Sequence, residues 1–212
     1  MLILLLSSSV NKVQYIQDNL VSSGDSLGEI KIWDVRCKKK QVFSFKEQSE
    51  EISDITYSYN TNFLLATSID GTLGVYDLRK KPNYKLYALS DFIEDELHCL
   101  KIMENGKKVV CGTSEGPLAI FNWDWFGDYK DRILGHPGRI NCIEKFNEDM
   151  MFTGCEDGHI RIVSLYLKNI EKVIGDAKKL DIKENKEFND IELLSLNMSK
   201  YDYIIIFIFL FR

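Results

Sequence analysis

The sequence contains a unit that recurs about every 43 residues, and this repeat constrains the fold more than any other feature. Four stretches align on a leading glycine: "GEIKIWDVR" (28–36), "GTLGVYDLR" (71–79), "GPLAIFNWD" (116–124) and "GHIRIVSLY" (158–166). The glycines lie 43, 45 and 42 residues apart. In each stretch the second and fourth positions after the glycine are aliphatic, which is the two-residue period of a strand with one buried face. Such a repeat predicts an architecture of similar units stacked side by side.

A second landmark precedes each glycine by 18 or 19 residues. It is a segment with apolar residues at its first and fourth positions, and it begins at Val10, Ile52, Leu97 and Ile140. An apolar pair, small residues and an acidic residue then lead to the glycine. This pattern predicts a hairpin, because glycine adopts positive φ and the carboxylate accepts hydrogen bonds from the amides of the turn. The predicted turn residues are Gly28, Asp70, Gly71, Gly116, Asp157 and Gly158.

Each unit is therefore predicted to hold four strands, with segments 41–45 and 84–89 as the fourth strands of the first two units. Four-stranded units of this length that end on Trp-Asp, or on a related pair, are typical of WD-repeat blades. The pairs are Trp33-Asp34, Tyr76-Asp77, Phe121-Asn122 and the divergent Val163-Ser164. The sequence thus predicts an all-β WD-repeat β-propeller in a single domain over 1–212, with blades at about 8–48, 50–90, 95–134 and 138–175.

The segment "FNWDWFGDYKDRILGHPG" (121–138) is predicted to join the third unit to the fourth. It contains Trp123, Trp125 and Phe126, which an alternative interpretation would place in a ligand cage. Aromatic residues in repeat proteins usually fill the space between neighbouring units. We therefore expect these three side chains to pack between blades.

The same segment, with "GKKVVCGTSEG" before it and "INCIEKF" after it, resembles the nucleolar WD repeat-containing protein family that serves ribosome biogenesis. The resemblance covers about residues 10–196. It implies a nuclear, nucleolar protein with pre-ribosomal particle components as partners, and a seven-bladed ring of which this chain matches the third to sixth blades. A polar insertion at 176–190 would precede the start of a last blade at 191–212. We therefore expect an open arc of four blades.

Composition and cysteine usage narrow the class of protein. With 45% hydrophobic residues and a net charge of -5, the chain is globular and is not coated with basic residues. Its five cysteines form no C-x-x-C pair and no regular spacing, so neither a metal site, a cofactor nor a disulfide framework is expected, and a reducing, intracellular compartment fits best. The apolar runs at 2–6 and 203–211 are much shorter than the roughly 20 residues of a membrane-spanning helix, so no membrane contact is expected.

No catalytic motif accompanies the three histidines His98, His136 and His159. Each is expected to be structural, and His136 is expected to hydrogen-bond Asp157 of the same blade, as the corresponding pair does in WD repeats. The chain is therefore predicted to be a non-enzymatic scaffold for other proteins, because function has to be argued from a site and no reactive site is indicated.

Two short motifs suggest an alternative partner. Their residues, Trp33, Asp34 and Arg36 in the first unit and Tyr76, Asp77 and Arg79 in the second, resemble the W-D-x-R box through which some WD-repeat proteins dock onto the adaptor of cullin-RING ubiquitin ligases. On that interpretation the chain would be a substrate receptor of such a ligase. Arginine at this position also commonly caps an exposed strand end, which leaves both readings open.

Basic residues cluster in three loops that open on the same rim of a WD propeller. They are Arg36, Lys38, Lys39, Lys40, Arg79, Lys80, Lys81, Lys107 and Lys108. Such a patch has the chemistry to contact the phosphates of RNA. Lysine is also the usual solvating residue of hairpin loops, and the clusters hold no interleaved aromatic residues for base stacking, so direct RNA contact is left open.

Overall fold

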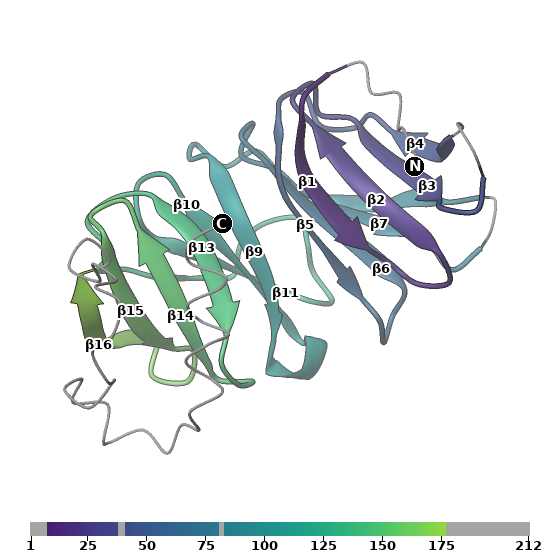
Figure 1. Ribbon diagram of the computed structural model, residues 1–212. Helices are drawn as coiled ribbons and strands as arrows, with labels where there is room; N and C mark the ends of the chain where they lie inside the picture. The colour runs from purple at the N-terminus through teal and green to yellow at the C-terminus, as the bar shows by residue number, and fades with distance from the viewer. Residues whose placement is uncertain (1–7, 38–40, 81–82, 177–212) are drawn as a thin grey trace, which may run out of the picture.

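The computed structural model describes residues 8–37, 41–80 and 83–176. It contains four antiparallel sheets of four strands each, which we call blades 1 to 4 in chain order (Figure 1). The strands are β1 Val10–Tyr15, β2 Leu20–Asp25, β3 Ile30–Asp34 and β4 Gln41–Phe45 in blade 1; β5 Ile52–Ser58, β6 Phe63–Ser68, β7 Leu73–Asp77 and β8 Lys85–Leu89 in blade 2; β9 Leu97–Met103, β10 Lys108–Thr113, β11 Leu118–Asn122 and β12 Asp131–Ile133 in blade 3; and β13 Ile140–Lys145, β14 Met150–Cys155, β15 His159–Ser164 and β16 Asn169–Asp176 in blade 4. The prediction of an all-β propeller with four-stranded blades is confirmed.

Within each blade the strands pair in the order in which they occur along the chain. The turn between the second and third strands has a glycine with positive φ in all four blades, at Gly28, Gly71, Gly116 and Gly158. Residues with a side chain rarely adopt this backbone conformation, which explains why glycine recurs at this step.

The blades lie side by side, with their first strands β1, β5, β9 and β13 next to one another along the inner side of an arc (Figure 1). The hydrophobic core lies between the blades. Ile30 and Ile32 of blade 1, for example, pack in one cluster with Leu64 and Tyr76 of blade 2. Similar clusters fill the boundaries between blades 2 and 3 and between blades 3 and 4.

A hydrogen bond between inner strands recurs at each boundary. The side chain of Asn11 donates to the carbonyl of Ile52 at 3.4 Å, and Ser53 donates to the carbonyl of Leu97 at 2.5 Å. At the third boundary the thiol of Cys99 contacts the carbonyl of Ile140 at 3.5 Å. In each case a side chain near the start of one inner strand satisfies the first carbonyl of the next, which fixes the register between blades.

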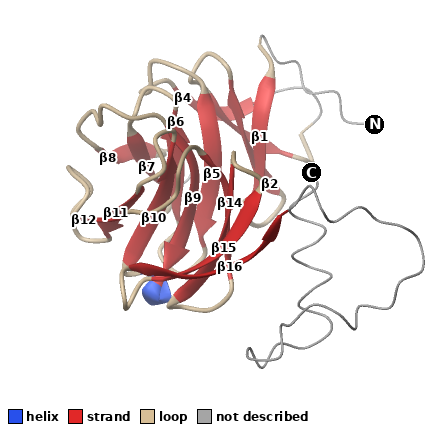
Figure 2. Cartoon of the chain, turned by 90° about the vertical axis from the view of Figure 1, so that its left-hand side faces the viewer, coloured by secondary structure: helices blue, strands red, loops and turns tan. Residues whose placement is uncertain are grey.

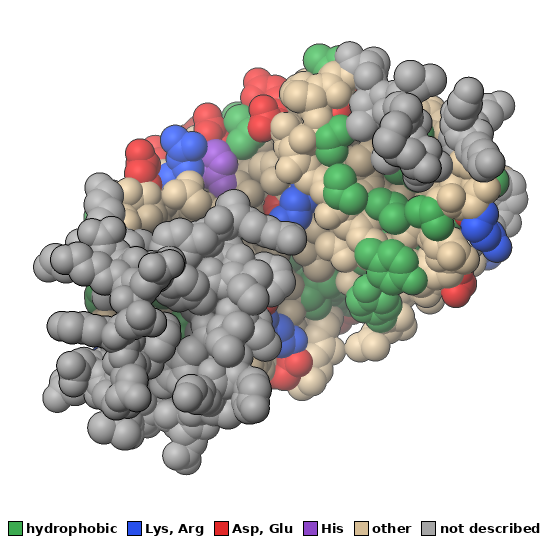
Figure 3. Space-filling model, in the orientation of Figure 1, with side chains coloured by type: hydrophobic (Ala, Val, Ile, Leu, Met, Phe, Trp, Pro, Cys, Tyr) green, Lys and Arg blue, Asp and Glu red, His purple; other side chains and the backbone are tan. Residues whose placement is uncertain are grey.

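The arc ends at blade 1 on one side and at strand β16 of blade 4 on the other. In blade 1, Val13 and Tyr15 on β1 remain more than half exposed, and hydrophobic side chains gather over β1 and β2 in the space-filling view (Figure 3). At the other end, Asp176 closes β16. The remainder of the predicted polar insertion and the predicted start of a last blade at 191–212 lie outside the described residues.

Candidate functional site

The loops that follow the first and third strands of every blade lie on one face of the arc, because these two strands run in the same direction. We call this the rim face, and the opposite face the turn face. A single turn of 3-10 helix, η1 Glu104–Gly106, marks the rim face at the lower end of the strands in Figure 2. The described residues of the rim-face loops are 16–19, 35–37, 59–62, 78–80, 83–84, 104–107, 123–130, 146–149 and 165–168.

The first W-D-x-R motif is divided between core and surface. Trp33 is buried, and its indole N–H donates a hydrogen bond of 2.8 Å to the hydroxyl of Ser23. Arg36 lies on the rim face with 66% of its side chain exposed. Its Nε and Nη2 donate to the two carboxylate oxygens of Asp34 at 2.9 and 2.6 Å, which fixes the plane of the guanidinium group.

The second motif repeats this arrangement. Tyr76 is buried and donates a hydrogen bond of 3.2 Å to the side-chain oxygen of Gln48. Arg79 donates to both oxygens of Asp77 at 2.8 and 2.6 Å, and these bonds lower the pKa of that carboxyl to about 2. The guanidinium carbon of Arg79 also lies 4.9 Å from the centre of the Phe63 ring. The two motifs thus place a rigid arginine at the same position of neighbouring blades.

The basic clusters are only partly described. Lys38, Lys39, Lys40 and Lys81 lie outside the described residues. Lys80 and Lys107 are exposed on the rim face. Lys108 is instead half-buried and donates a hydrogen bond of 2.5 Å to the carboxylate of Glu104. Of the predicted lysines that the structure describes, Lys80 and Lys107 are therefore exposed, and Lys108 is already engaged by Glu104.

On the turn face, a carboxylate organises the turn of blade 2. Asp70 accepts hydrogen bonds from the amide of Thr72 at 3.0 Å and from the amide of Ser49 at 2.7 Å. It therefore joins its own turn to the strand connection that leads into the blade. Burial opposes this charge, but the hydrogen bonds from Thr72 and Ser49 outweigh it and lower the pKa of Asp70.

Blade 3 departs from the predicted turn. The residue before its turn glycine is Glu115, but the amides of Ser114 and Glu115 donate to Asp95, at 3.1 and 3.3 Å. The turn carboxylate thus comes from the connection between blades 2 and 3. Sequence reasoning missed Asp95 because nothing in the local pattern links it to a turn about 20 residues later.

The predicted hydrogen bond between His136 and Asp157 is wrong. His136 is buried and its Nε2 lies 2.8 Å from the hydroxyl of Thr153. Asp157 instead accepts two hydrogen bonds from Arg161, at 3.0 and 2.5 Å, and one from the amide of His159 at 3.0 Å. A guanidinium group satisfies both carboxylate oxygens at once, so it displaces the neutral imidazole as the partner of Asp157.

The prediction for the aromatic loop is correct for two of its three side chains. Trp123 and Phe126 pack in the boundary between blades 2 and 3, where the Trp123 ring lies 6.1 Å from that of Phe63. Trp125 is instead 65% exposed on the rim face. Strand alternation could not have separated the two tryptophans, because Trp123 and Trp125 lie two residues apart and would point to the same side of an extended segment.

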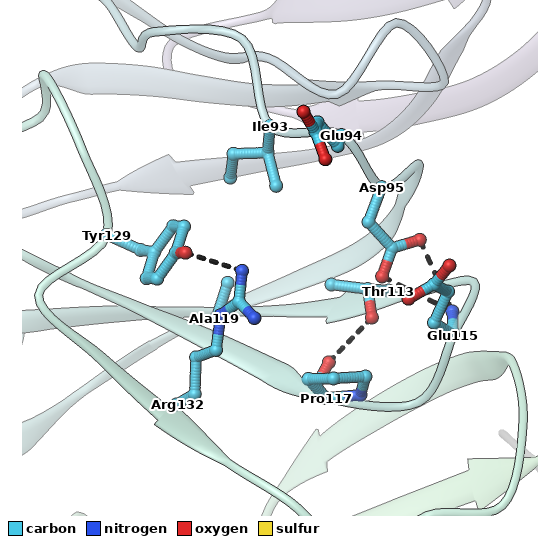
Figure 4. A pocket seen from close by; sticks show the side chains of 9 residues that line it. All are labelled: Ile93, Glu94, Asp95, Thr113, Glu115, Pro117, Ala119, Tyr129 and Arg132. Atoms are coloured by element: carbon cyan, nitrogen blue, oxygen red, sulfur yellow. Dashed lines mark hydrogen bonds between the residues drawn. The ribbon is translucent and has the colours of Figure 1, made fainter.

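A small cavity of about 170 Å³ is lined by residues 93–95 of the β8–β9 connection, by the turn of blade 3, and by Tyr129 and Arg132 (Figure 4). Several of its polar groups are paired with each other. Arg132 donates a hydrogen bond of 2.5 Å to the hydroxyl of Tyr129, and Thr113 donates one of 2.8 Å to the carbonyl of Pro117. Asp95 is held by the turn amides. The cavity brings together no pair of a nucleophile and a base.

A larger hollow of about 460 Å³ is lined by the inner strands. Ion pairs cross it from blade to blade, from Lys12 to Asp54 at 2.7 Å and from Lys101 to Glu144 at 2.9 Å. Among the described residues, no group of three or more His, Cys, Asp or Glu side chains is placed to hold a metal ion. Within that same part of the chain, no helix has the length and apolar character needed to cross a membrane.

Comparison with known proteins identifies the repeat. The family model "WD domain, G-beta repeat" matches residues 39–77 and 128–164. Each match begins near the outer strand of one blade and ends with the third strand of the next, so the sequence repeat is offset from the blade by one strand.

Curated relatives extend the similarity. The chain is 35% identical to "WD repeat-containing protein 55" of Arabidopsis thaliana over 85% of its length and 51% of the relative. It is 32% identical to the protein of that name from Mus musculus, over 80% of this chain and 42% of the relative. The "WD repeat-containing protein 55 homolog" of Drosophila erecta is 31% identical over 84% of this chain and 36% of the relative. The chain therefore spans about half, or less, of the length of the relatives it matches.

Solved structures agree on the fold. A chain in "Crystal Structure of Mitotic Checkpoint Complex" superposes with a TM-score of 0.69 at 16% identity, over 81% of this chain and 54% of that one. The computationally designed Ika8 protein superposes with a TM-score of 0.66 at 22% identity, over 79% of this chain and 49% of that one. The repeat, the blades and the relatives together place the chain in the family of WD-repeat proteins, among those similar to WD repeat-containing protein 55.

Proposed function

We propose that the chain is a non-enzymatic scaffold on which other proteins assemble during ribosome biogenesis, in the nucleolus. The observation that carries the scaffold role is the separation of buried and exposed side chains in the W-D-x-R segments of blades 1 and 2. Trp33 is buried in blade 1 and Tyr76 packs at the boundary between blades 1 and 2, and the arginine three residues after each of them is fixed on the rim face. Rigid arginines and exposed aromatic rings are the side chains that contribute most to protein interfaces.

The ribosomal part of the proposal rests on the family resemblance of residues 10–196. The similarity to WD repeat-containing protein 55 over at least 80% of the chain in the plant and mouse relatives supports it. The proposed partners are components of pre-ribosomal particles, which would contact the rim face through Arg36 and Arg79.

The test is affinity purification of the tagged chain from nuclear extract, followed by sedimentation on a density gradient. We expect the chain to sediment with particles that contain pre-ribosomal RNA. The variant Arg36→Glu/Arg79→Glu is expected to lose this association, whereas Arg139→Glu, which alters an exposed arginine on the turn face, is expected to retain it. Sedimentation of the parent chain only as free protein would contradict the proposal.

The same two arginines support one alternative function. If the W-D-x-R motifs dock onto the adaptor of a cullin-RING ubiquitin ligase, the chain is a substrate receptor. The same purification separates the two functions, because the receptor would recover the adaptor and cullin in place of pre-ribosomal particles. Loss of the adaptor from Arg36→Glu/Arg79→Glu would then favour the receptor.

A further inference from the structure

Large aromatic side chains are exposed in three separate loops of the rim face. Tyr59, Trp125 and Tyr166 are 59%, 65% and 83% exposed, and they belong to blades 2, 3 and 4 in turn. None of them lies inside the basic clusters of the sequence. The fold brings these rings to the same face as Arg79, Lys80 and Lys107.

We propose that the rim face of blades 2 and 3 binds single-stranded nucleic acid. Bases stack on Trp125, on Tyr59 and on the guanidinium plane of Arg79, and phosphates meet Lys80 and Lys107. Alternating stacking surfaces and isolated cations suit a strand whose bases are unpaired, because every base has a face that can stack. This binding activity goes beyond the protein scaffold and does not depend on it.

Arg79 is already arranged as a stacking surface. Asp77 holds the guanidinium group through two hydrogen bonds of 2.8 and 2.6 Å, and one face of the group lies over the Phe63 ring. Roughly half of the Arg79 side chain, 53%, is still exposed. A base that stacks on Arg79 therefore does not have to order the side chain first.

Trp125 and Lys107 are both connected to the Phe63 ring, against which Arg79 also packs, through Trp123. The Trp123 ring stacks on Phe63 with centres 6.1 Å apart, and the amide of Trp123 donates a hydrogen bond of 2.8 Å to the carbonyl of Lys107. Trp125 follows two residues later, and its amide donates to the carbonyl of Asn122 at 3.0 Å. The Phe63–Trp123 pair thus connects Arg79 of blade 2 with Lys107 and Trp125 of blade 3.

Acidic residues on the rim face offset its lysines and arginines, so we expect base stacking to contribute more to binding than attraction between lysines and phosphates. Glu104 and Glu148 are engaged by Lys108 and Lys145, at 2.5 and 2.6 Å. Asp124 and Asp128 are exposed in the same loop as Trp125, so the face as a whole is not strongly positive. With about two phosphates contacted, the logarithm of the association constant should fall with the logarithm of salt with a slope of about -1.4.

Tyr59 extends the surface on blade 2. Its ring packs edge-on against Tyr57 with centres 5.0 Å apart, and the Tyr57 hydroxyl donates a hydrogen bond of 2.6 Å to Asn62. The exposed Tyr59 ring therefore packs against a side chain, Tyr57, whose position is fixed by its hydrogen bond to Asn62. Tyr166 of blade 4 offers a further ring for a longer strand.

The proposal is tested by fluorescence anisotropy on the full chain with labelled oligonucleotides of about ten nucleotides. The probes are oligouridylate, oligoadenylate, the matching single-stranded DNA, and an RNA duplex of the same length. We expect the single strands to bind and the duplex to bind at least about tenfold more weakly, since paired bases cannot stack on side chains. The RNA and DNA probes show whether the sugar contributes to recognition.

Trp125→Ala and Tyr59→Ala are each expected to weaken single-strand binding by about fivefold or more. The matched control is Phe92→Ala, which removes a ring that is 71% exposed in the β8–β9 connection on the turn face. Unchanged melting temperatures of all three variants would show that the fold is intact.

The proposal is overturned if the duplex binds as tightly as the single strands, if the salt slope is near zero, or if Phe92→Ala weakens binding as much as Trp125→Ala. It is also overturned if Trp125→Ala loses protein partners while nucleic-acid binding stays at the parent level. Trp125→Ala that loses the oligonucleotide but still sediments with pre-ribosomal particles would separate this binding activity from the scaffold function.

Discussion

The carboxylate of Asp54 accepts a hydrogen bond of 3.0 Å from the backbone amide of Leu100, across the boundary between blades 2 and 3. Its other oxygen lies 2.7 Å from Nζ of Lys12 in blade 1. One nearly buried side chain thus links the inner strands of three blades. The two contacts differ in accessibility, because Leu100 is fully buried and Lys12 is partly exposed.

This difference predicts unequal effects of two substitutions. Asp54→Ala is expected to lower the free energy of unfolding by about 1–3 kcal/mol, because the buried amide of Leu100 loses its acceptor. Lys12→Ala removes only a partly exposed ion pair, and a loss below about 1 kcal/mol is expected. Urea denaturation followed by circular dichroism measures both values. Equal losses would show that the amide of Leu100 finds another acceptor.

Substitutions at two glycines with positive φ can separate backbone strain from steric collision as the reason that glycine is required at a turn. Gly71 and Gly106 have φ values of +78° and +85°, so a side chain strains the backbone at either position. A Cβ on Gly71 would also collide with the carbonyl oxygen of Ile93, whereas a Cβ on Gly106 would meet no atom within 4 Å. We expect Gly71→Val to lower the melting temperature clearly more than Gly106→Val. A Gly71→Val chain as stable as the parent would contradict this account of the turn.

The buried imidazole of His136 predicts a pH dependence of stability. Burial, together with the nearby charge of Arg161, lowers the pKa of His136 from 6.5 to about 4. As the pH falls from about 6.5 to 4, the unfolded chain binds a proton that the folded chain does not, so the free energy of unfolding decreases. Above pH 6.5 this contribution is constant. Asp157 does not titrate in this window, because Arg161 holds its pKa well below the ordinary value.

The measurement is the difference in free energy of unfolding between the parent and His136→Gln, recorded from pH 4 to pH 7.5. We expect the parent to lose more stability than the variant as the pH falls, because glutamine has no titrating group. A difference that stays constant across this range would mean that His136 titrates normally in the folded chain.

The Arg161–Asp157 pair can be tested through the same histidine. Arg161→Met removes two hydrogen bonds to Asp157 and the positive charge that lowers the pKa of His136. The free energy of unfolding is expected to fall by about 1–3 kcal/mol. The pKa of His136, followed by NMR of the imidazole ring, is expected to rise from about 4 towards 6.5. If the pKa of His136 stays unchanged in Arg161→Met, burial alone lowers this pKa in the parent chain.

The sequence by itself determined the blades. The spacing of Gly28, Gly71, Gly116 and Gly158 and the alternating aliphatic residues after them specify strands and tight turns. These features depend on backbone conformation and on a two-residue period, both of which are local properties of the chain. For the same reason the fourth strands of the first two blades were predicted within one residue of their observed bounds.

Only the tertiary structure decided which side chains face a partner. Trp123 and Trp125 belong to one loop, but Trp123 packs against Phe63 of the neighbouring blade, whereas Trp125 is exposed at the surface. Arg161, and not the predicted His136, hydrogen-bonds the carboxylate of Asp157, because a guanidinium group can donate to both carboxylate oxygens at once. The rim face gathers Tyr59 and Trp125, which are far apart in sequence, because consecutive blades repeat the same strand directions and so place corresponding loops on the same side.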